Sequence, residues 1–351
     1  MKKISQTFIF FIVLIIFFQS CNKKGDYEKE FKKIKFLEYE TFNLKNNQFY
    51  SKIYKLLIYK DKIIAYDYNK ETFFSITDIS DNIIINHFGK LGQGPNEVMM
   101  MPSTLTIIND SFYFYNSSQN SLFSTNLKEK DKYMPNKIID FDPNKKIINA
   151  LPIAYKRYIA LGGFEGGRYL LLDENGNSLS SFFKYPEFTN YKNITNLHKA
   201  LAFQGHLMRR PDGKRFFFAG RESEIIEILE IDKTDNINKI FNFHGRIAEF
   251  NFDGDGINFT ASTIKNKSKL FFIDANCTQN YIYLLYSNKV IKDNLSNALK
   301  SSKILVIDWN GKPINLFQLD IDVNYIAVDE NDVILYAYNA DEEQLVKFNI
   351  K

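Results

Sequence analysis

Cysteine and histidine are scarce in this chain, and their scarcity limits how the protein is stabilised and what chemistry it supports. Among 351 residues there are only two cysteines, Cys21 and Cys277, and four histidines. Two cysteines make at most one disulfide, so the fold relies on a large core rather than on covalent crosslinks. The histidines form neither a His-x-x-x-His nor a His-Glu-x-x-His pair, which leaves a zinc site without support. We expect no metal and no cofactor.

The sequence also lacks a large excess of charge of one sign, and it lacks helical periodicity. The 45 basic and 41 acidic residues nearly balance, and this balance gives no reason to expect a nucleic acid as partner. No long stretch places apolar residues at the i, i+3, i+4, i+7 spacing of an amphipathic helix. There is no Gly-x-Ser-x-Gly elbow, and no Lys-Ser or Lys-Thr pair follows the glycine-rich stretch "GKLGQGPNE". The sequence therefore predicts neither a serine hydrolase of that kind nor a phosphate-binding loop.

The apolar run near the N-terminus is short. It extends from Phe8 to Phe18 and follows two basic residues, Lys2 and Lys3. A membrane-spanning helix needs about 20 apolar residues, whereas the apolar region of a secretory signal needs about 7–15. The run therefore indicates a signal peptide.

A cysteine follows this run directly. The segment Phe18-Gln19-Ser20-Cys21 resembles a bacterial lipobox, in which the cysteine is acylated and becomes the first residue of the mature protein. The resemblance implies that residues 1–20 are removed and that a lipid on Cys21 holds the protein on a membrane. Because residue 22 is not Asp, resemblance to known lipoproteins favours the outer membrane, on a periplasmic or surface-facing side that the sequence does not determine. The alternative is an ordinary signal peptide followed by an incidental cysteine.

The residues after the lipobox divide into a polar segment and a domain. Residues 21–34 are rich in Lys, Glu and Asp, and we expect them to form a solvated, lipidated tether. Residues 35–351 then form the folded domain. Lipidation of Cys21 would leave Cys277 without a disulfide partner, and the apolar, strand-like sequence around Cys277 predicts a buried, unreactive thiol.

An internal repeat runs through this domain. A polar turn pair followed by aromatic and β-branched residues recurs at intervals of about 50 residues. The first strand residues of these runs are Ile63, Phe112, Tyr158, Phe216, Tyr281 and Val333. A second strand follows each of them, and most units have a further apolar strand on either side. Such units predict an all-β fold, a six-bladed β-propeller with four-stranded antiparallel blades. A pair of all-β sandwiches is the alternative.

Two units depart from the repeat. In the fifth, the polar stretch 287–302 lengthens one connection and suggests a short helix. The sixth ends at Lys351 with only three strands, which would leave a row of unpaired backbone groups at its edge. Residues 35–44 alternate like a strand, and we expect them to supply the missing outermost strand and close the ring.

The connector between the first two units carries a phenylalanine-glycine start, spaced glycines, an acidic residue and a proline before the next strand. These positions are Phe88, Gly89, Gly92, Gly94, Pro95, Glu97 and Pro102. The pattern resembles the blade connectors of NHL-type propellers, whose glycines allow positive φ where the chain crosses from the rim to the centre. With the lipobox, the whole chain resembles the six-bladed, TolB-like or NHL-like propeller lipoproteins of Gram-negative bacteria.

This resemblance does not choose a function, because propellers use their channels for many tasks. We expect a lipid-anchored envelope protein whose propeller is a non-catalytic module that binds a small molecule, a glycan or a protein. A six-bladed propeller enzyme, such as a hydrolase, lyase or oxidoreductase acting at the central channel, is the alternative. No catalytic residue is predicted. The stretch "FDGDGINF", residues 252–259, resembles part of a calcium loop but lacks its closing glutamate, so we expect a turn there.

Arg209 and Arg210 are the predicted binding residues. The first strand of each propeller unit lines the axis, and "GHLMRRP" carries two guanidinium groups there. A guanidinium in a narrow channel can fork onto a carboxylate, a phosphate or a sugar acid. Because neighbours on a strand alternate, only one of the two should face the axis. Arg210 is the first candidate and Arg209 its alternate, while the competing interpretation is a rim arginine paired with a carboxylate.

Overall fold

We analysed a computed structural model of the chain. It describes residues 26–351 except for 100–101, 130–132, 188–193, 255–258, 265–267 and 293. Within these residues, no helix has the length and apolar character needed to cross a membrane. The predicted signal peptide and Cys21 lie outside the described residues.

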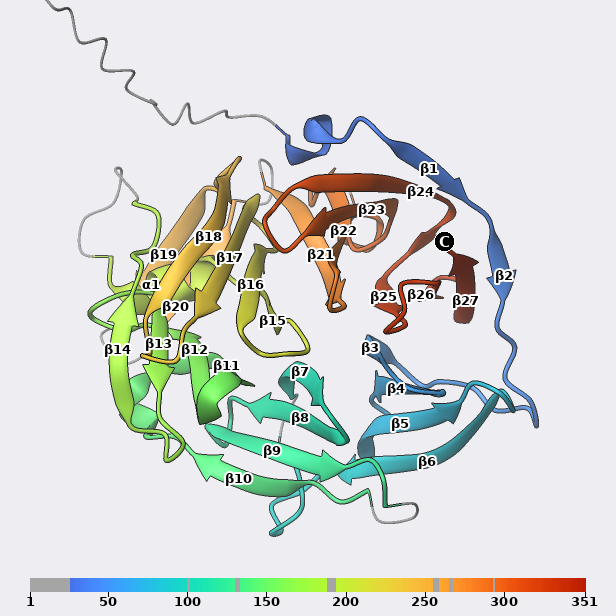
Figure 1. Ribbon diagram of the computed structural model, residues 1–351, viewed down its shortest axis with the longest axis horizontal. Helices are drawn as coiled ribbons and strands as arrows, with labels where there is room; N and C mark the ends of the chain where they lie inside the picture. The colour runs from blue at the N-terminus through green and yellow to red at the C-terminus, as the bar shows by residue number, and fades with distance from the viewer. Residues whose placement is uncertain are drawn as a thin grey trace, which may run out of the picture.

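Six antiparallel sheets surround a central axis, and each is one blade of a propeller (Figure 1). The predicted all-β, six-bladed fold is confirmed. Blade one contains β3 (Ile53–Tyr59), β4 (Lys62–Asp67), β5 (Thr72–Asp78) and β6 (Ile83–Lys90). Blade two contains β7 (Ser103–Ile108), β8 (Ser111–Asn116), β9 (Ser121–Asn126) and β10 (Asn136–Asp140). Blade three contains β11 (Ile147–Ile153), β12 (Arg157–Gly162), β13 (Tyr169–Leu172) and β14 (Ser178–Phe182).

The second half of the ring repeats this arrangement. Blade four contains β15 (Gly205–Arg209), β16 (Arg215–Gly220), β17 (Ile225–Ile231) and β18 (Ile237–His244). Blade five contains β21 (Lys269–Cys277), β22 (Tyr281–Val290), β23 (Ser301–Asp308) and β24 (Pro313–Val323). Blade six contains β25 (Tyr325–Val328), β26 (Ile334–Asn339) and β27 (Gln344–Asn349).

Packing between blades explains why the middle strands are apolar almost throughout. Phe216, Phe217 and Phe218 of β16 have no exposed surface. Successive side chains of a strand point to opposite faces of its sheet. Phe217 accordingly packs in a cluster with Leu284 of blade five, while its two neighbours pack with Leu161 of blade three. Both faces of a middle strand are therefore buried in the core, and for this reason its sequence does not alternate between apolar and polar residues.

The innermost strands of the six blades all run in the same direction along the axis, because each blade repeats the same strand order. These strands are β3, β7, β11, β15, β21 and β25. The disc therefore has a start side, where these strands begin, and an end side, where they end. Connections between blades, and the turns between second and third strands, lie on the start side. Turns between first and second strands, and between third and fourth strands, lie on the end side.

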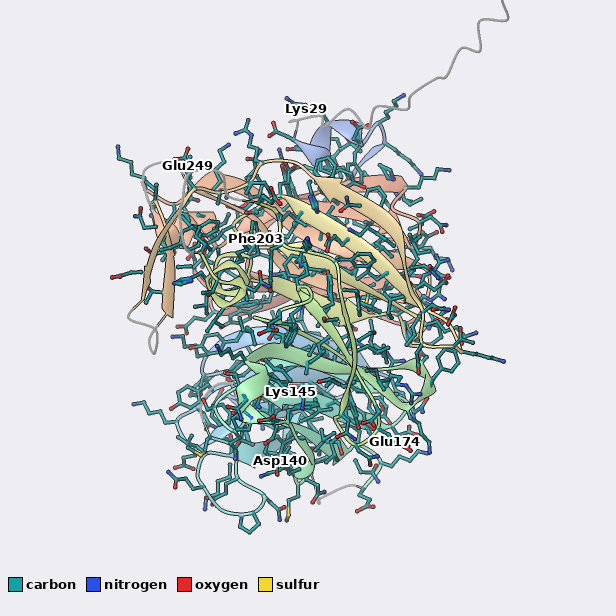
Figure 2. The ribbon with its side chains drawn as sticks, turned by 90° about the vertical axis from the view of Figure 1, so that its left-hand side faces the viewer. Lys29, Asp140, Lys145, Glu174, Phe203 and Glu249 are labelled. Atoms are coloured by element: carbon teal, nitrogen blue, oxygen red, sulfur yellow. The ribbon has the colours of Figure 1, made fainter. Side chains whose placement is uncertain are left out.

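Three additional elements interrupt the blade pattern, and all occur in start-side connections. Helix α1 (Asn196–Ala202) precedes blade four, and the hairpin of β19 (Phe250–Gly254) and β20 (Phe259–Thr263) precedes blade five. Helix α2 (Leu295–Ala298) lies in the polar insertion of blade five, as predicted. Figure 2 shows the disc from the side. Phe203, which follows α1, and Glu249, which precedes β19, lie on the left, whereas Glu174, in the end-side turn between β13 and β14, lies on the right. Short 3-10 helices occur at η1 (Tyr27–Glu30), η2 (Pro143–Lys145) and η3 (Ala154–Lys156).

The N-terminal segment closes the ring, as the three strands of the sixth unit predicted. Strand β2 (Tyr39–Thr41) pairs antiparallel with β27 and becomes the outermost strand of blade six. Its neighbour β1 (Ile34–Leu37) instead pairs in parallel with β24 of blade five. The segment thus wraps two blades in succession along the outside of the disc (Figure 1). The expectation of one blade-six strand over residues 35–44 is refined, because the chain crosses the gap between the two blades.

Part of the expected solvated tether, residues 21–34, is packed against the propeller. Tyr27 and Phe31 are buried with residues of blades four and five. The backbone N–H of Tyr27 donates to Glu224 over 2.7 Å, and its hydroxyl donates to the carbonyl of Gly311 over 3.0 Å. The expectation of a solvated tether up to residue 34 is therefore wrong for the described part of this segment. The folded domain begins before residue 35, because two aromatic side chains anchor this polar stretch.

The connector after blade one shows what its glycines do. Gly89 has a φ of +73°, and a Cβ there would lie 2.7 Å from the ring of Phe74. Glu97 folds back into the loop, where it accepts the N–H of Gly94 over 2.9 Å and pairs with Lys90 over 2.9 Å. A Cβ on Gly92 would meet this carboxylate. Gly89, Gly92, Gly94 and Glu97 therefore shape a tight loop after the outermost strand of blade one, and they line neither axial cavity, whereas Pro102 at the end of the connector lines one of them.

Candidate functional site in the central channel

Two cavities lie along the axis, one toward each side of the disc. The start-side cavity has a volume of about 340 Å³ and is lined by residues of all six blades, including Lys55, Thr104, Asn149, His206, Asp274 and Tyr325. The end-side cavity has a volume of about 430 Å³, and its lining includes Tyr59, Ile107, Arg209, Asn276 and Val328. Met208 of β15 contributes to both. Blade four therefore supplies residues along the whole channel.

Arg209 is the buried cation of the end-side cavity. Its side chain is held by the turn that follows β15, where Nε donates to the carbonyl of Arg210 over 3.2 Å and Nη2 to that of Pro211 over 2.8 Å. Gly213, with a φ of +70°, completes this turn. A Cβ on Gly213 would lie 2.2 Å from Nη2 of Arg209. The predicted Asp-Gly turn thus makes room for the guanidinium group.

The charge of Arg209 has carbonyl partners and no salt bridge. Among the described residues, no carboxylate lies within ion-pair distance of it, and both of its hydrogen bonds go to backbone oxygens. Burial lowers the pKa of Arg209 to about 10, so the group stays protonated at neutral pH. Asp212 is near enough to favour this charge but is already paired with Arg210, so Arg209 has no ion pair of its own among the described residues, which favours the entry of an anion.

Arg210 occupies a different environment. Its Nε and Nη2 form a bidentate pair with Asp212 over 3.0 and 2.7 Å. The guanidinium also lies 5.9 Å from the centre of the Trp309 ring. The carboxylate neutralises Arg210, which is absent from the lining of either axial cavity. The geometry thus gives the channel position to Arg209, the alternate of the predicted pair.

Cys277 lies beside Arg209 in the end-side cavity. Its Sγ donates to the carbonyl of Arg209 over 3.1 Å. Burial raises the pKa of the Cys277 thiol to about 12, so the thiolate required of a nucleophile is not populated at neutral pH. The thiol therefore contributes packing and one hydrogen bond to this wall.

A buried ion pair lies at the start-side cavity. Lys55 of β3 lies 2.6 Å from Oδ1 of Asp274 on β21, and both side chains are nearly inaccessible. Lys55 also donates to the carbonyl of Ala275. The other oxygen of Asp274 accepts the N–H of Ile326 over 2.8 Å. These contacts join blades one, five and six around the axis and leave the pair without net charge.

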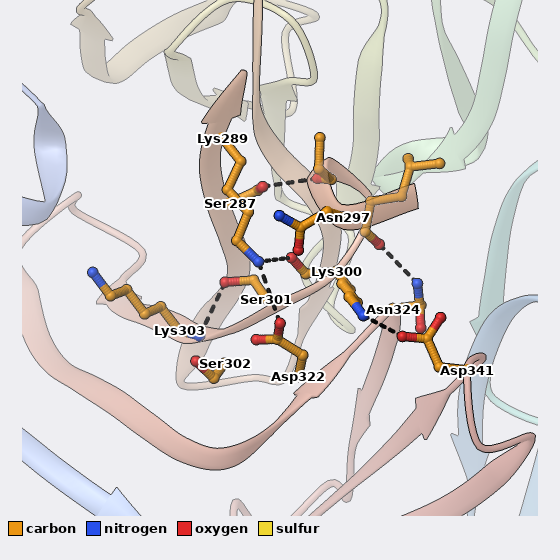
Figure 3. A network of polar contacts seen from close by, with 12 residues as sticks. Ser287, Lys289, Asn297, Lys300, Ser301, Ser302, Lys303, Asp322, Asn324 and Asp341 are labelled. Atoms are coloured by element: carbon orange, nitrogen blue, oxygen red, sulfur yellow. Dashed lines mark hydrogen bonds and ion pairs between the residues drawn. The ribbon is translucent and has the colours of Figure 1, made fainter. Parts of the chain in front are cut away.

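The insertion of blade five forms part of the start-side wall, and a network of polar contacts connects it to blade six (Figure 3). Leu299, which follows α2, and Asn324, which precedes blade six, both line the cavity. The side-chain amide of Asn324 donates to the carbonyl of Leu299 over 2.9 Å. Lys300 forms an ion pair with Asp341 of blade six, and Lys289 donates to the carbonyl of Lys300 over 2.8 Å. The wall is therefore fixed by polar contacts across two blades.

Several residues of the start-side cavity carry no local signal of function in the sequence. His206 lies in the same "GHLMRR" strand as the predicted arginines, but its spacing from the other histidines argues only against a zinc site. Tyr66 lies in the repeated aromatic run of blade one, where nothing local separates a cavity residue from a core residue. Of the partial calcium-loop stretch, residues 252–254 lie in β19 and residue 259 lies in β20, while residues 255–258, where a turn was expected, lie outside the described residues. Among the described residues, no group of three or more metal-binding side chains is found.

Comparisons with known proteins agree with the fold. No curated protein matches the chain. A "Putative exported protein" from Bacteroides fragilis aligns with a TM-score of 0.52 and 11% identity, over 90% of this chain and 95% of that one. The calcium-binding protein regucalcin from Agrobacterium tumefaciens aligns with a TM-score of 0.50 and 8% identity, over 91% and 95% of the two chains. At these identities the likeness concerns the fold alone.

A family model gives a more direct assignment. The model described as TolB-like 6-blade propeller-like matches residues 30–331, which is most of the chain. The match begins within the N-terminal segment that closes the ring and extends into blade six. The chain belongs to the TolB-like six-bladed propeller family.

Proposed function

We propose that this protein is a lipid-anchored envelope protein whose propeller binds an anionic ligand, without transforming it, in the end-side cavity. The ligand carries a carboxylate, a phosphate ester or a sugar-acid group. One observation carries the proposal: Arg209 lines this cavity with a buried, protonated guanidinium whose hydrogen bonds, within the described part of the chain, go to backbone carbonyls. A guanidinium of this kind can form strong, charge-assisted hydrogen bonds with an incoming anion.

The surroundings of Arg209 suit a small polar ligand. Asn276 and Gln279 line the same cavity and offer amide donors and acceptors. Tyr59 also lines it, although its hydroxyl already donates to Asp110 over 2.6 Å. The cavity volume of about 430 Å³ falls in the range of small-molecule sites, roughly 300–1,000 Å³. An anion would exchange its hydration for the guanidinium and these amides.

We expect Arg209→Met to weaken binding of such an anion about 10- to 100-fold, because a hydrogen bond to a charged group contributes about 1.5–3 kcal/mol. Purified protein is first screened by thermal shift against carboxylates, phosphate esters and sugar acids. The affinity of any hit is then measured by calorimetry for wild type and variants. Circular dichroism verifies that Arg209→Met keeps its fold, since the side chain also holds the turn.

Arg210→Met is the matched control, because it removes a neighbouring guanidinium that Asp212 already neutralises. It should change the affinity less than about threefold, and Arg209→Lys should recover part of the loss. A hit that binds equally well to Arg209→Met would remove the site. Turnover of a bound compound would favour the enzyme alternative instead.

The anchor is proposed from the lipobox resemblance around Cys21, together with a Bacteroides fragilis fold relative that is described as exported. We expect an alkyne fatty acid fed to cells to label the wild-type protein and not Cys21→Ala. Acyl chains contribute about 0.8 kcal/mol per buried CH₂ group to membrane binding, so Cys21→Ala should also move to the soluble fraction.

Cys277→Ala provides the control for the labelling experiment, because it removes the chain's other cysteine. This variant should be labelled like wild type and remain with the membranes. Equal labelling of wild type and Cys21→Ala would contradict the anchor.

A further inference from the structure

A buried hydroxyl at the start-side cavity has no hydrogen-bond partner among the residues that the structure describes. Tyr66 of β4 is 5% exposed, and its Oη makes no hydrogen bond to any described residue. Its ring packs against Tyr54 and Phe74, with centroid distances of 4.9 and 5.7 Å. A phenylalanine would make the same ring contacts, whereas an unsatisfied buried hydroxyl destabilises the fold. Tyr66 lines the cavity while its Oη is covered by neighbouring atoms, so a molecule that enters the cavity and displaces them can supply the missing hydrogen bond.

A hydrogen-bond acceptor stands in the same wall. Nε2 of His206 lies 3.0 Å from the carbonyl oxygen of Phe272. A carbonyl only accepts, so Nε2 carries the proton and Nδ1 is left as an acceptor. Burial lowers the pKa of His206 to about 4, which keeps the ring neutral at physiological pH. The cavity wall thus offers an imidazole acceptor as well as a phenolic hydroxyl.

The remaining lining mixes polar, aromatic and aliphatic side chains and carries little net charge. Tyr325 adds another phenolic side chain, and Gln204 adds an amide. The Lys55–Asp274 pair is internally neutralised over 2.6 Å. One further cation, Arg221, is exposed at this cavity. Such a wall suits a ligand whose groups both donate and accept hydrogen bonds and whose carbon framework contacts tyrosine rings.

We propose that the start-side cavity is a second binding site, for a saccharide. A sugar hydroxyl donates one hydrogen bond and accepts others, which matches a wall that offers the phenolic side chains of Tyr66 and Tyr325 and the imidazole of His206. The cavity volume of about 340 Å³ fits one or two sugar rings. This site does not depend on the proposed function at Arg209, because the two cavities lie on opposite sides of the disc.

The position of the cavity supports a recognition role. Helix α1, the β19–β20 hairpin and the insertion with α2 all extend connections on the start side. Long connections on a rigid scaffold often carry binding residues. Here the insertion of blade five supplies Leu299 to the wall, and Asn324 and the Lys300–Asp341 pair hold it in place (Figure 3).

The experiment uses purified full-length protein and a printed glycan array, followed by calorimetry with the sugars that bind. Glucose, galactose, N-acetylglucosamine and glucuronic acid are titrated in every case. We expect a saccharide hit whose affinity falls about tenfold or more in Tyr66→Phe, since this change removes only the hydroxyl. The melting temperature of Tyr66→Phe should equal or exceed that of wild type, because the hydroxyl has no partner to lose.

Three further variants test whether the sugar occupies this cavity. Tyr283→Phe removes a hydroxyl that donates to Asp332 over 2.8 Å elsewhere; it should lower stability and leave sugar binding unchanged. Arg209→Met should also leave sugar binding unchanged. The proposal is overturned if no saccharide binds, or if binding is unaffected by Tyr66→Phe, which would assign the hydroxyl to water. Binding of glucuronic acid alone, lost in Arg221→Met and not in Tyr66→Phe, would also overturn it and indicate an anion site.

Discussion

Replacing Glu227 by glutamine is expected to lower the free energy of unfolding by about 3–5 kcal/mol, because the change leaves a buried arginine without its counter-ion. Glu227 of β17 lies 3.1 Å from Nη1 of Arg168, and its carboxylate also accepts the hydroxyl of Tyr169 over 2.6 Å. Both charged side chains are almost completely inaccessible. Denaturant unfolding followed by fluorescence measures the change.

Rings and not hydrogen bonds surround the guanidinium of Arg168. None of its nitrogens makes a well-aligned hydrogen bond to a described residue. The group lies 4.3 Å from the ring centre of Phe218 and 5.1 and 5.3 Å from those of Tyr169 and Tyr185. Its charge is therefore balanced by Glu227 and by aromatic faces. This is why loss of the carboxylate should have a large effect.

The same pair sets an expected pH dependence. Burial by itself raises the pKa of Glu227, but Arg168 and hydrogen bonds from His244 and Tyr169 outweigh it and hold this pKa well below its ordinary value. A carboxylate with a depressed folded-state pKa contributes stability above its unfolded pKa, about 4.3, and that contribution is lost as the pH falls. The stability difference between wild type and Glu227→Gln should therefore be constant near neutral pH and shrink below about pH 4.

A double variant tests whether the loss comes from an unpaired charge. Arg168→Met with Glu227→Gln removes both charges, and it should be more stable than Glu227→Gln alone. A double variant that loses the sum of the two single losses would contradict the pairing. A stability difference that grows on acidification would contradict the pH argument.

A chain that begins at residue 46 is expected not to fold cooperatively, whereas a chain that begins at residue 26 should fold. The longer deletion removes β1 and β2 and exposes the backbone edges of β24 and β27. It also removes four buried side chains, Tyr27, Phe31, Leu37 and Phe42, each worth about 1.5–3 kcal/mol. Size-exclusion chromatography and thermal melting compare the two chains, and aggregation of the longer deletion is the expected result.

Single substitutions separate side-chain packing from strand pairing in this segment. Tyr27→Ala should cost about 3–5 kcal/mol, because the ring packs 4.6 Å from Phe243 and its hydroxyl bonds Gly311. Phe36→Ala is the matched control, since Phe36 is an aromatic residue of the same segment that is 76% exposed. It should change stability by less than about 0.5 kcal/mol. A soluble, cooperatively melting chain from residue 46 would refute the closure.

The blade architecture was predictable from the sequence because its signals are local. A turn pair such as Asp212-Gly213 and the aromatic run after it define a hairpin within a few residues. Repetition of that hairpin then implies blades, since one such unit cannot bury both of its faces alone. Closure was predictable for a similar reason: a sixth unit with three strands requires a fourth from elsewhere.

Contacts between distant residues were decided only by the tertiary structure. The docking of Tyr27 depends on Glu224 and Gly311, which are far away in the chain. Nothing in the local sequence of residues 21–34 distinguishes such an anchor from a solvated tether. Pairing of Arg168 with Glu227 likewise joins blades three and four.

The choice between the two arginines shows the same division. The sequence placed both at the end of an innermost strand, and alternation left the choice open. Arg210 pairs with Asp212 in the turn, whereas Arg209 donates to the carbonyl of Pro211 and lines the end-side cavity. Sequence by itself determined the fold and the strand that lines the axis, because both follow from local repeats. Which side chains face each cavity was decided by the packing of all six blades around the axis, because each wall is assembled from residues of different blades.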